Sequence, residues 1–262
     1  MNPDTCVVDP NYKLDEDYDG GCSLKQRCMH PLIDYKKNTL ITFTFKYSLT
    51  LTGFKTVVTF YEFSEEKTVS KIKHTIDGMV YLHGFLYTDK YYILFNIPMR
   101  PNMIGYAFGK NAIMRNVDDK VSDNFMIYLI PRDGNPMKTH ITLNTNDHGF
   151  VYHGINSYDE DNTIIIDVFL SQLNAERESS QFEVNDQYNV YCNNGEVCRY
   201  VINLDDNKVT KKGIANIVGS TIDFRTIGKD YNGVKYNYSF ICSHDMETKT
   251  CSLYKIDMNK SE

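Results

Sequence analysis

The stretch ITFTFKYSLTLTGF, residues 41–54, is the clearest structural signal in the sequence. Its large side chains alternate with small polar or charged ones; the large ones are Ile41, Phe43, Phe45, Tyr47, Leu49 and Leu51. A repeat of two residues is typical of a β-strand, in which successive side chains point to opposite faces of a sheet. The stretch therefore predicts a long strand.

Similar β-rich runs continue to the end of the chain. They include TVVTFYEF, GMVYLHGFLYT, KYYILFNI, NFMIYLI, TIIIDVFL, CRYVINL, KYNYSFICS and CSLYKIDM. Turn-forming residues separate them, for example at 132–136, 159–162, 193–195 and 205–207. Only SQLNAERESSQ, residues 171–181, has a helical composition. We predict an all-β fold, with sandwich, barrel and propeller left open by periodicity alone.

Composition limits the class of protein. A chain of 262 residues with 42% apolar and 24% charged residues is globular and long enough for one all-β domain. Its net charge of −6 and lack of a long basic run argue against a nucleic-acid partner. The seven cysteines contain no CxxC pair, so we expect most of them to be reduced. No run of about 18 apolar residues and no leader pattern is present, which predicts a cytoplasmic location.

Three of the seven histidines stand in unusual contexts. His30 precedes a proline in CMHPLIDYKK, His83 lies within the apolar run YLHGFLYT, and His153 lies in FVYHGINSYDED. Taken singly, each context also fits a histidine buried in a core or held in a turn, and the neighbouring Cys28 fits an incidental loop cysteine. All three would reach one point only if successive sheets surround a common axis, as in a propeller.

At these residues the chain resembles the carotenoid cleavage oxygenases, a family that includes retinyl ester isomerohydrolase. The resemblance follows several segments in order: HPLIDYKKNTLITFTF, YLHGFLYTDKYYILFNIPM, NFMIYLIPRDGNP, YHGINSYDEDNTIIIDVF and CRYVINLDDNKV. It covers about residues 28–262, which we expect to be an incomplete propeller domain, and leaves 1–27 poorly matched.

The resemblance implies a seven-bladed β-propeller with Fe²⁺ on its axis, held by four histidines. His30, His83 and His153 fall on three of the four ligand positions. Neutral imidazole suits Fe²⁺, and four neutral ligands leave open positions for dioxygen and a polyene. Asp223 in STIDFRTIGKD falls on an acidic position that hydrogen-bonds a ligating histidine. The family's fourth histidine has no counterpart before residue 262, so we expect the chain to be the middle of a longer protein.

The segment IPMRPNMIGYAFGKNAIMR, residues 97–115, mixes apolar and basic side chains. In the family the corresponding segment forms the mouth of an apolar tunnel at the bilayer, which implies peripheral membrane contact. The residues concerned are Met103, Ile104, Tyr106, Phe108, Ile113 and Met114. An ordinary buried connection between blades is the alternative.

The resemblance predicts an Fe²⁺-dependent oxygenase that cleaves a conjugated double bond of a carotenoid or apocarotenoid with dioxygen. Two alternatives stay open. One is retinyl ester isomerohydrolysis, which uses the metal as a Lewis acid. The other is a catalytically inactive propeller portion that binds lipid or another protein, which the missing fourth histidine favours.

Overall fold

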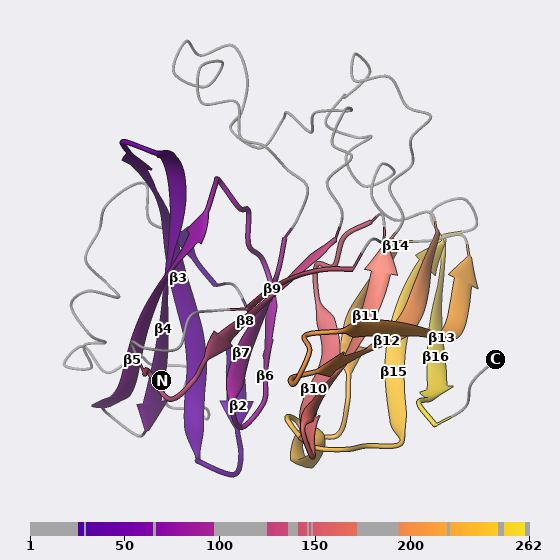
Figure 1. Ribbon diagram of the computed structural model, residues 1–262. Coiled ribbons are helices and arrows are strands. Elements are labelled where there is room, and N and C mark those ends of the chain that lie inside the picture. Colours follow the sequence, from indigo (N-terminus) through magenta and orange to yellow (C-terminus); the bar gives the residue numbers. More distant parts are fainter. Residues whose placement is uncertain are drawn as a thin grey trace, which may run out of the picture. The chain divides into compact units, whose positions relative to one another are not determined.

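The computed structural model describes residues 26–28, 30–64, 67–96, 125–135, 141–145, 147, 149–171, 194–218, 221–245 and 249–259 (Figure 1). For residues 194, 218, 221–226, 229, 244 and 245 it describes the backbone alone. The described residues form β-strands and one short 3₁₀ helix, η2 (Lys229–Tyr231). The all-β prediction is thus confirmed, while the expected helical stretch at 171–181 falls almost entirely outside the described residues. Within the described part, no helix is long and apolar enough to cross a bilayer.

The chain divides into two compact units, Met1–Gly78 and Met79–Glu262. In the described part of the first unit the strands form one antiparallel sheet of order β1-β3-β4-β5, in which β2 also pairs with β3. Its strands are β1 (Gln26–Arg27), β2 (Leu32–Asp34), β3 (Thr39–Thr50), β4 (Gly53–Ser64) and β5 (Lys67–Asp77).

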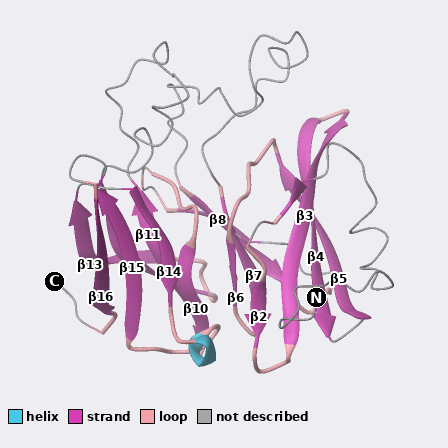
Figure 2. Cartoon of the chain, turned by 180° about the vertical axis from the view of Figure 1, so that it is seen from behind, coloured by secondary structure: helices cyan, strands magenta, loops and turns pink. Residues whose placement is uncertain are grey.

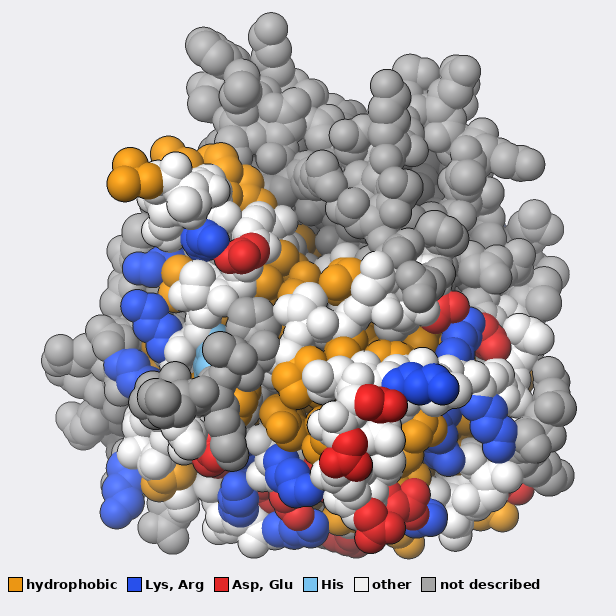
Figure 3. Space-filling view, in the orientation of Figure 1, with side chains coloured by type: hydrophobic (Ala, Val, Ile, Leu, Met, Phe, Trp, Pro, Cys, Tyr) orange, Lys and Arg blue, Asp and Glu red, His pale blue; other side chains and the backbone are white. Residues whose placement is uncertain are grey.

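The predicted strand at 41–54 forms β3 and the start of β4, joined by a two-residue turn at residues 51–52. Gly53 closes the turn with φ +112°, a value that residues with a side chain rarely adopt. The apolar side chains are buried at Ile41, Phe43 and Phe45, but Leu49 and Leu51 are exposed at the hairpin tip. Figure 3 shows hydrophobic side chains gathered at this tip, at the upper left of the view. Period two therefore marks the strand without showing how far its buried part extends.

The described residues of the second unit form three sheets, and in each the strands follow one another in chain order. The first sheet has β6 (Phe85–Tyr87), β7 (Tyr91–Phe95), β8 (Met126–Pro131) and β9 (Ile141–Asn144). The second has β10 (Gly154–Glu160), β11 (Thr163–Ser171), β12 (Asn194–Asn203) and β13 (Val209–Val218). The third has β14 (Thr221–Thr226), β15 (Tyr238–Asp245) and β16 (Thr250–Asp257). Figure 2 shows the three sheets from behind, with η2 below β10 and β14.

The second sheet is buried on both faces. Along β11, Ile164, Ile166 and Val168 pack into a core shared with the first sheet. The alternate residues Ile165 and Phe169 pack into a second core shared with the third sheet. A strand covered on both sides needs apolar residues at successive positions, which explains the run from Ile164 to Leu170, interrupted only by Asp167.

Contacts also join the first strands of these sheets, β6 to β10 and β10 to β14. A Ser157 hydroxyl on β10 donates a hydrogen bond to the Tyr87 carbonyl of β6 at 2.8 Å. Consecutive sheets whose first strands adjoin have the arrangement of propeller blades around a central channel.

Candidate metal centre

The structure brings two of the predicted histidines together within the second unit. His83 lies just before β6 and His153 just before β10, 70 residues later. Their Nε2 atoms are 3.1 Å apart, and the ring planes meet at 61° with centroids separated by 4.9 Å. Both side chains are half-buried. The pair follows from the adjoining first strands, since each histidine precedes one of them.

A glycine after each histidine permits this approach. A Cβ on Gly84 would lie 2.4 Å from the carbonyl oxygen of Tyr152, and a Cβ on Gly154 would lie 2.4 Å from Cδ1 of Leu86. Neither position leaves room for a side chain. At Gly84 the obstacle is the backbone of Tyr152, which cannot move as easily as a side chain. The repeated His-Gly dipeptide was the sequence signal for this close contact, and sequence reasoning did not use it.

The run GMVYLHGFLYT was expected to be strand throughout, but only Phe85–Tyr87 pairs as β6. Residues 79–84 precede the paired part of the strand, where Gly84 passes beneath the Tyr152 carbonyl. His83 therefore projects from the end of a strand. An imidazole within an apolar run is explained by its position at this junction of two sheets.

An aromatic side chain that sequence reasoning did not single out supports the pair. The Tyr152 ring packs edge-on against His83, with centroids 5.1 Å apart, and edge-on against Phe150 at the same separation. Phe150 is fully buried. Because edge-to-face contacts restrict ring rotation, Tyr152 limits the orientations available to His83.

The geometry of the pair suits two ligands of a single metal ion. Metal–imidazole bonds are about 2.0–2.1 Å long, so two ligands at right-angled or tetrahedral positions have nitrogens about 3 Å apart. The observed 3.1 Å agrees with that separation. Neutral imidazole is a ligand that suits iron, copper, nickel and zinc, so the donor set alone does not choose the metal.

His30 lies in the first unit. Its backbone N–H donates to the sulfur of Cys28 at 3.4 Å, and Cys28 itself is buried with only 7% of its surface exposed. Cys28 thus contributes to the local structure before β2.

Two polar residues, Arg132 and Thr88, make the hydrogen bonds that hold the C-terminal end of β6. Arg132, in the PRDG segment, is buried and donates from Nη1 to the Thr88 carbonyl at 2.9 Å. Its guanidinium also lies over the ring of Tyr87, 5.1 Å from the centroid. The Thr88 hydroxyl accepts hydrogen bonds from the backbone N–H groups of Lys90 and Tyr91. These contacts fix the turn between β6 and β7. The fixed turn keeps β6, which follows His83, in place.

Asn156 fixes the start of β10. Its amide donates to the carbonyls of Tyr231 and Val234, both at 2.9 Å, and accepts from the Gly233 N–H at 3.0 Å. The strand register shifts between Gly154 and Asn156, which marks a bulge directly after His153. Asn156 thereby holds the bulge against the turn that precedes β15.

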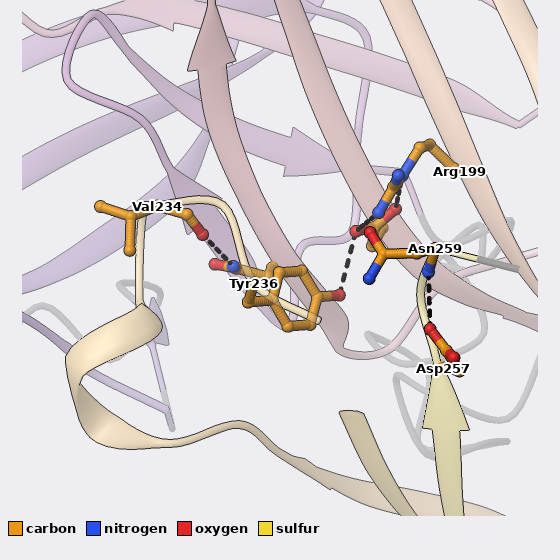
Figure 4. Close-up of polar contacts among 7 residues, drawn as sticks. Arg199, Val234, Tyr236, Asp257 and Asn259 are labelled. Atoms are coloured by element: carbon orange, nitrogen blue, oxygen red, sulfur yellow. Dashed lines mark hydrogen bonds and ion pairs between the residues drawn. The ribbon is translucent and has the colours of Figure 1, made fainter. Parts of the chain in front are cut away.

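A second polar cluster joins the second sheet to the segment that precedes β15 (Figure 4). The Arg199 guanidinium makes a two-pronged contact with Asp167, with bonds of 2.7 and 2.9 Å, and Tyr236 donates to the same carboxylate at 2.9 Å. Burial raises the pKa of Tyr236 well above its ordinary value, so its hydroxyl remains a donor. Arg199 belongs to the Arg-Tyr segment of the sequence, and the structure gives it this stabilising contact.

The sequence matches a known protein family over most of its length. The model of the family described as RPE65, retinal pigment epithelial membrane protein, matches residues 9–262. The chain belongs to the carotenoid cleavage oxygenase family. An apocarotenoid-15,15'-oxygenase from Synechocystis is 30% identical over 128 residues, which are 48% of this chain and 24% of that protein.

Solved structures of the family share the fold. A point mutant of the Synechocystis oxygenase, ACO, superposes with a TM-score of 0.65 at 22% identity, covering 87% of this chain and 50% of that one. Cobalt-substituted ACO gives 0.64 at 22% identity, with the same coverage. An ACO/RPE65 chimera gives 0.64 at 20% identity, covering 92% and 52%. The propeller prediction is confirmed, and the chain spans about half the length of these carotenoid oxygenases.

The roles predicted for Asp223 and for residues 97–115 remain predictions. Asp223 lies on β14, where its backbone is opposite Cys242, but its side chain is outside the described part of the chain. The whole predicted tunnel mouth, residues 97–115, is likewise outside the described residues. The division into a poorly matched segment 1–27 and a propeller domain 28–262 also stays a prediction.

Proposed function

We propose that the chain provides ligands for Fe²⁺ in an oxygenase that cleaves a conjugated double bond of a carotenoid or apocarotenoid. The single observation that carries the proposal is the 3.1 Å approach of the Nε2 atoms of His83 and His153, in a chain of the carotenoid cleavage oxygenase family. The family uses iron bound by histidines and acts on such polyenes with dioxygen. In this proposal His30, which the resemblance to the family puts at a ligand position, is the third ligand.

The described residues have distinct tasks in this proposal. His83 and His153 hold the ion, while Gly84 and Gly154 keep the two imidazoles close enough to share it. Tyr152 restricts the orientation of His83 through its edge-on contact. When bound, Fe²⁺ would supply positive charge and open coordination positions for dioxygen and the polyene.

Metal binding tests the ligand assignment. We expect the purified chain to bind Fe²⁺ or Co²⁺ in equal molar amount, measured by elemental analysis and by the visible absorption of the cobalt form. Removal of an outer hydrogen-bond partner of a metal ligand lowers metal affinity by about 10–100-fold. A His83→Ala, His153→Ala double variant, which removes two ligands, should lower the affinity further. His74→Ala, which removes an imidazole from β5, is the matched control. Equal metal content in the double variant and the control would refute the assignment.

Gly84→Ala tests the geometry without removing a ligand. The new methyl group meets the Tyr152 carbonyl at 2.4 Å, so the two histidines must move apart. We expect weaker metal binding with a changed cobalt spectrum. An unchanged spectrum would show that the close approach is unnecessary.

Substrate turnover tests the reaction. We expect the iron-loaded chain to shorten the conjugated system of an apocarotenoid in air, observed as loss of its visible absorption and formation of aldehyde products. Retained iron binding without cleavage would contradict the oxygenase proposal and favour a non-cleaving polyene-binding portion. Release of retinol from a retinyl ester would instead identify the isomerohydrolase alternative.

Peripheral membrane contact through residues 97–115 is a separate proposal, supported by the mixture of apolar and basic residues there. It is tested by flotation with anionic liposomes. Phe108→Glu should abolish flotation, whereas Leu51→Glu, at the exposed tip of the β3–β4 hairpin, should not. The reverse result would move the contact to the hairpin and refute this proposal.

A further inference from the structure

Two cysteines meet on the terminal hairpin of the described chain. Cys242 lies on β15 and Cys251 on β16, and their sulfur atoms are 3.5 Å apart. The antiparallel register pairs Cys242 with Leu253 and His244 with Cys251. The two cysteines are therefore diagonal neighbours on one face of the hairpin, two residues out of direct register.

Their surroundings differ from those of the other described cysteines. Cys251 is exposed and Cys242 is partly exposed, whereas Cys28 and Cys198 are buried. Burial raises the pKa of the Cys198 thiol to about 12, so this thiol is inert near neutral pH. The hydrogen bond to Cys251 raises the pKa of Cys242. Cys251 is the more exposed of the two cysteines, so a reagent in solution reaches its sulfur first.

We propose that Cys242 and Cys251 form a reversible disulfide, with a low-molecular-weight disulfide such as oxidised glutathione as the oxidant. The pair is a modification site on the surface of the third sheet and is independent of the histidine centre. Both sulfurs are already in contact, and one of them is open to a small reagent.

The reaction balances in two exchange steps. The Cys251 thiolate attacks one sulfur of oxidised glutathione, which breaks the glutathione S–S bond, forms a mixed disulfide and releases one glutathione thiolate. The Cys242 thiolate then attacks the Cys251 sulfur, which forms the protein disulfide and releases the second glutathione. Both protein thiols are oxidised, one molecule of glutathione disulfide is reduced to two thiols, and the two protons pass to the released thiolates or to water.

The hairpin can accommodate the bond. A disulfide is about 2.05 Å long and joins Cα atoms at most about 7 Å apart, whereas diagonal neighbours lie about 7–8 Å apart. The bond therefore requires side-chain rotation and a backbone movement that brings β16 closer to β15 at this point. The first six residues of β16, 250–255, are exposed, so the Cys251 side chain can rotate without displacing a core residue. The last residues of the strand carry the buried Ile256, followed by the buried Met258, into the core shared with the second sheet. The bond would therefore fasten β16, the last strand of the third sheet among the described residues, whose C-terminal end is already anchored.

Tryptic mass spectrometry after oxidation tests the proposal. Cleavage after Lys235, Lys249 and Lys255 places the two cysteines on separate peptides, 236–249 and 250–255. We expect the native chain, incubated with oxidised glutathione, to lose two hydrogens and to give these two peptides joined. Dithiothreitol should separate them. Stable glutathione adducts on both cysteines, or bonds joining either cysteine elsewhere, would overturn the proposal.

A matched variant keeps the number of thiols but changes their geometry. Cys251→Ser combined with Ser252→Cys moves the thiol to the opposite face of β16, because neighbouring strand residues alternate in direction. We expect this variant to stop at a mixed disulfide with glutathione and to yield no joined peptides. Equal cross-linking in this variant would show that chain mobility, rather than the observed contact, produces the bond, and would refute the proposal.

Discussion

The two faces of the second sheet contain different kinds of interface. Toward the first sheet, the described residues of the core are apolar or aromatic apart from the thiol of Cys198, and they include Ile164, Ile166 and Val168. Toward the third sheet, apolar residues surround the Asp167–Arg199–Tyr236 cluster. Ion pairs occur on both faces, but they differ in burial. On the first face the partly exposed Lys211 pairs with Asp147 and Glu196, and Asp147 accepts a hydrogen bond from the Tyr200 hydroxyl. On the second face the Asp167–Arg199 pair is buried. Apolar packing suffices to bring two sheets together, whereas the polar cluster also specifies which groups must meet.

The largest expected effect is on the polar face. Asp167→Ala leaves the Arg199 guanidinium, whose side chain is only 16% exposed, without its carboxylate. We expect a loss of about 3–5 kcal/mol in the free energy of unfolding, because a buried charge without its partner is costly. Chemical denaturation measures this loss. Asp167→Leu with Arg199→Met removes both charges and should cost less; an equal or greater cost would contradict the explanation.

Asn156→Ala should have the next largest effect. It removes the partner of two carbonyls and one N–H in the turn at residues 231–234. We expect a loss of about 1–3 kcal/mol, with faster amide exchange in that turn. Ser157→Ala, which removes one hydrogen bond to Tyr87, is the milder control. Equal exchange rates in the two variants would show that Asn156 does not hold the turn.

A smaller effect tests whether the apolar parts of the two faces are packed alike. Ile166→Val on the first face and Ile165→Val on the second each remove one methylene-sized volume from a buried site. We expect a loss of about 0.5–1.5 kcal/mol for each, because side chains in closely packed cores leave a small cavity when shortened. Thermal denaturation compares them. A clear difference would show that the polar cluster loosens or tightens its apolar neighbours.

The smallest effect depends on pH and concerns the contact of β10 with the first sheet. Asp159 accepts a hydrogen bond from the Asp89 N–H, but its other oxygen has no partner among the described residues. Burial raises the pKa of Asp159 above 3.8, although hydrogen bonding from Thr88 opposes the change. The folded state thus holds this proton more tightly than the unfolded state, and stability from this source is lost as pH rises through the folded pKa.

Asp159→Asn should remove this pH dependence. Relative to the native chain, the variant should gain stability as pH rises from about 3.8 into the weakly acidic range. The gain should stay below about 1 kcal/mol, because solvent screens a half-buried carboxylate. Denaturation midpoints at several pH values measure the difference. A difference that is constant with pH, or that shrinks as pH rises, would contradict the assignment.

Many strands were predictable because their sequence patterns are local. KYYILFNI contains β7, NFMIYLI contains all of β8 except its last residue, Pro131, and TIIIDVFL lies within β11. The shortening of β6 was not predictable, since it depends on Gly84 meeting the distant Tyr152 carbonyl. The exposure of Leu49 and Leu51 was also missed, because alternation records the face of a side chain and not whether another element covers it.

The sequence by itself determined that this chain is built of β-strands, and its ordered histidine segments indicated the family. Only the tertiary structure decided that His83 and His153 lie with their nitrogens 3.1 Å apart and that Asp167 finds Arg199 and Tyr236. The physical reason is the separation along the chain between the residues that determine each feature. Strand patterns arise from neighbouring residues, whereas the distance between side chains 70 positions apart is set by how whole sheets pack and by the glycines that allow their backbones to approach.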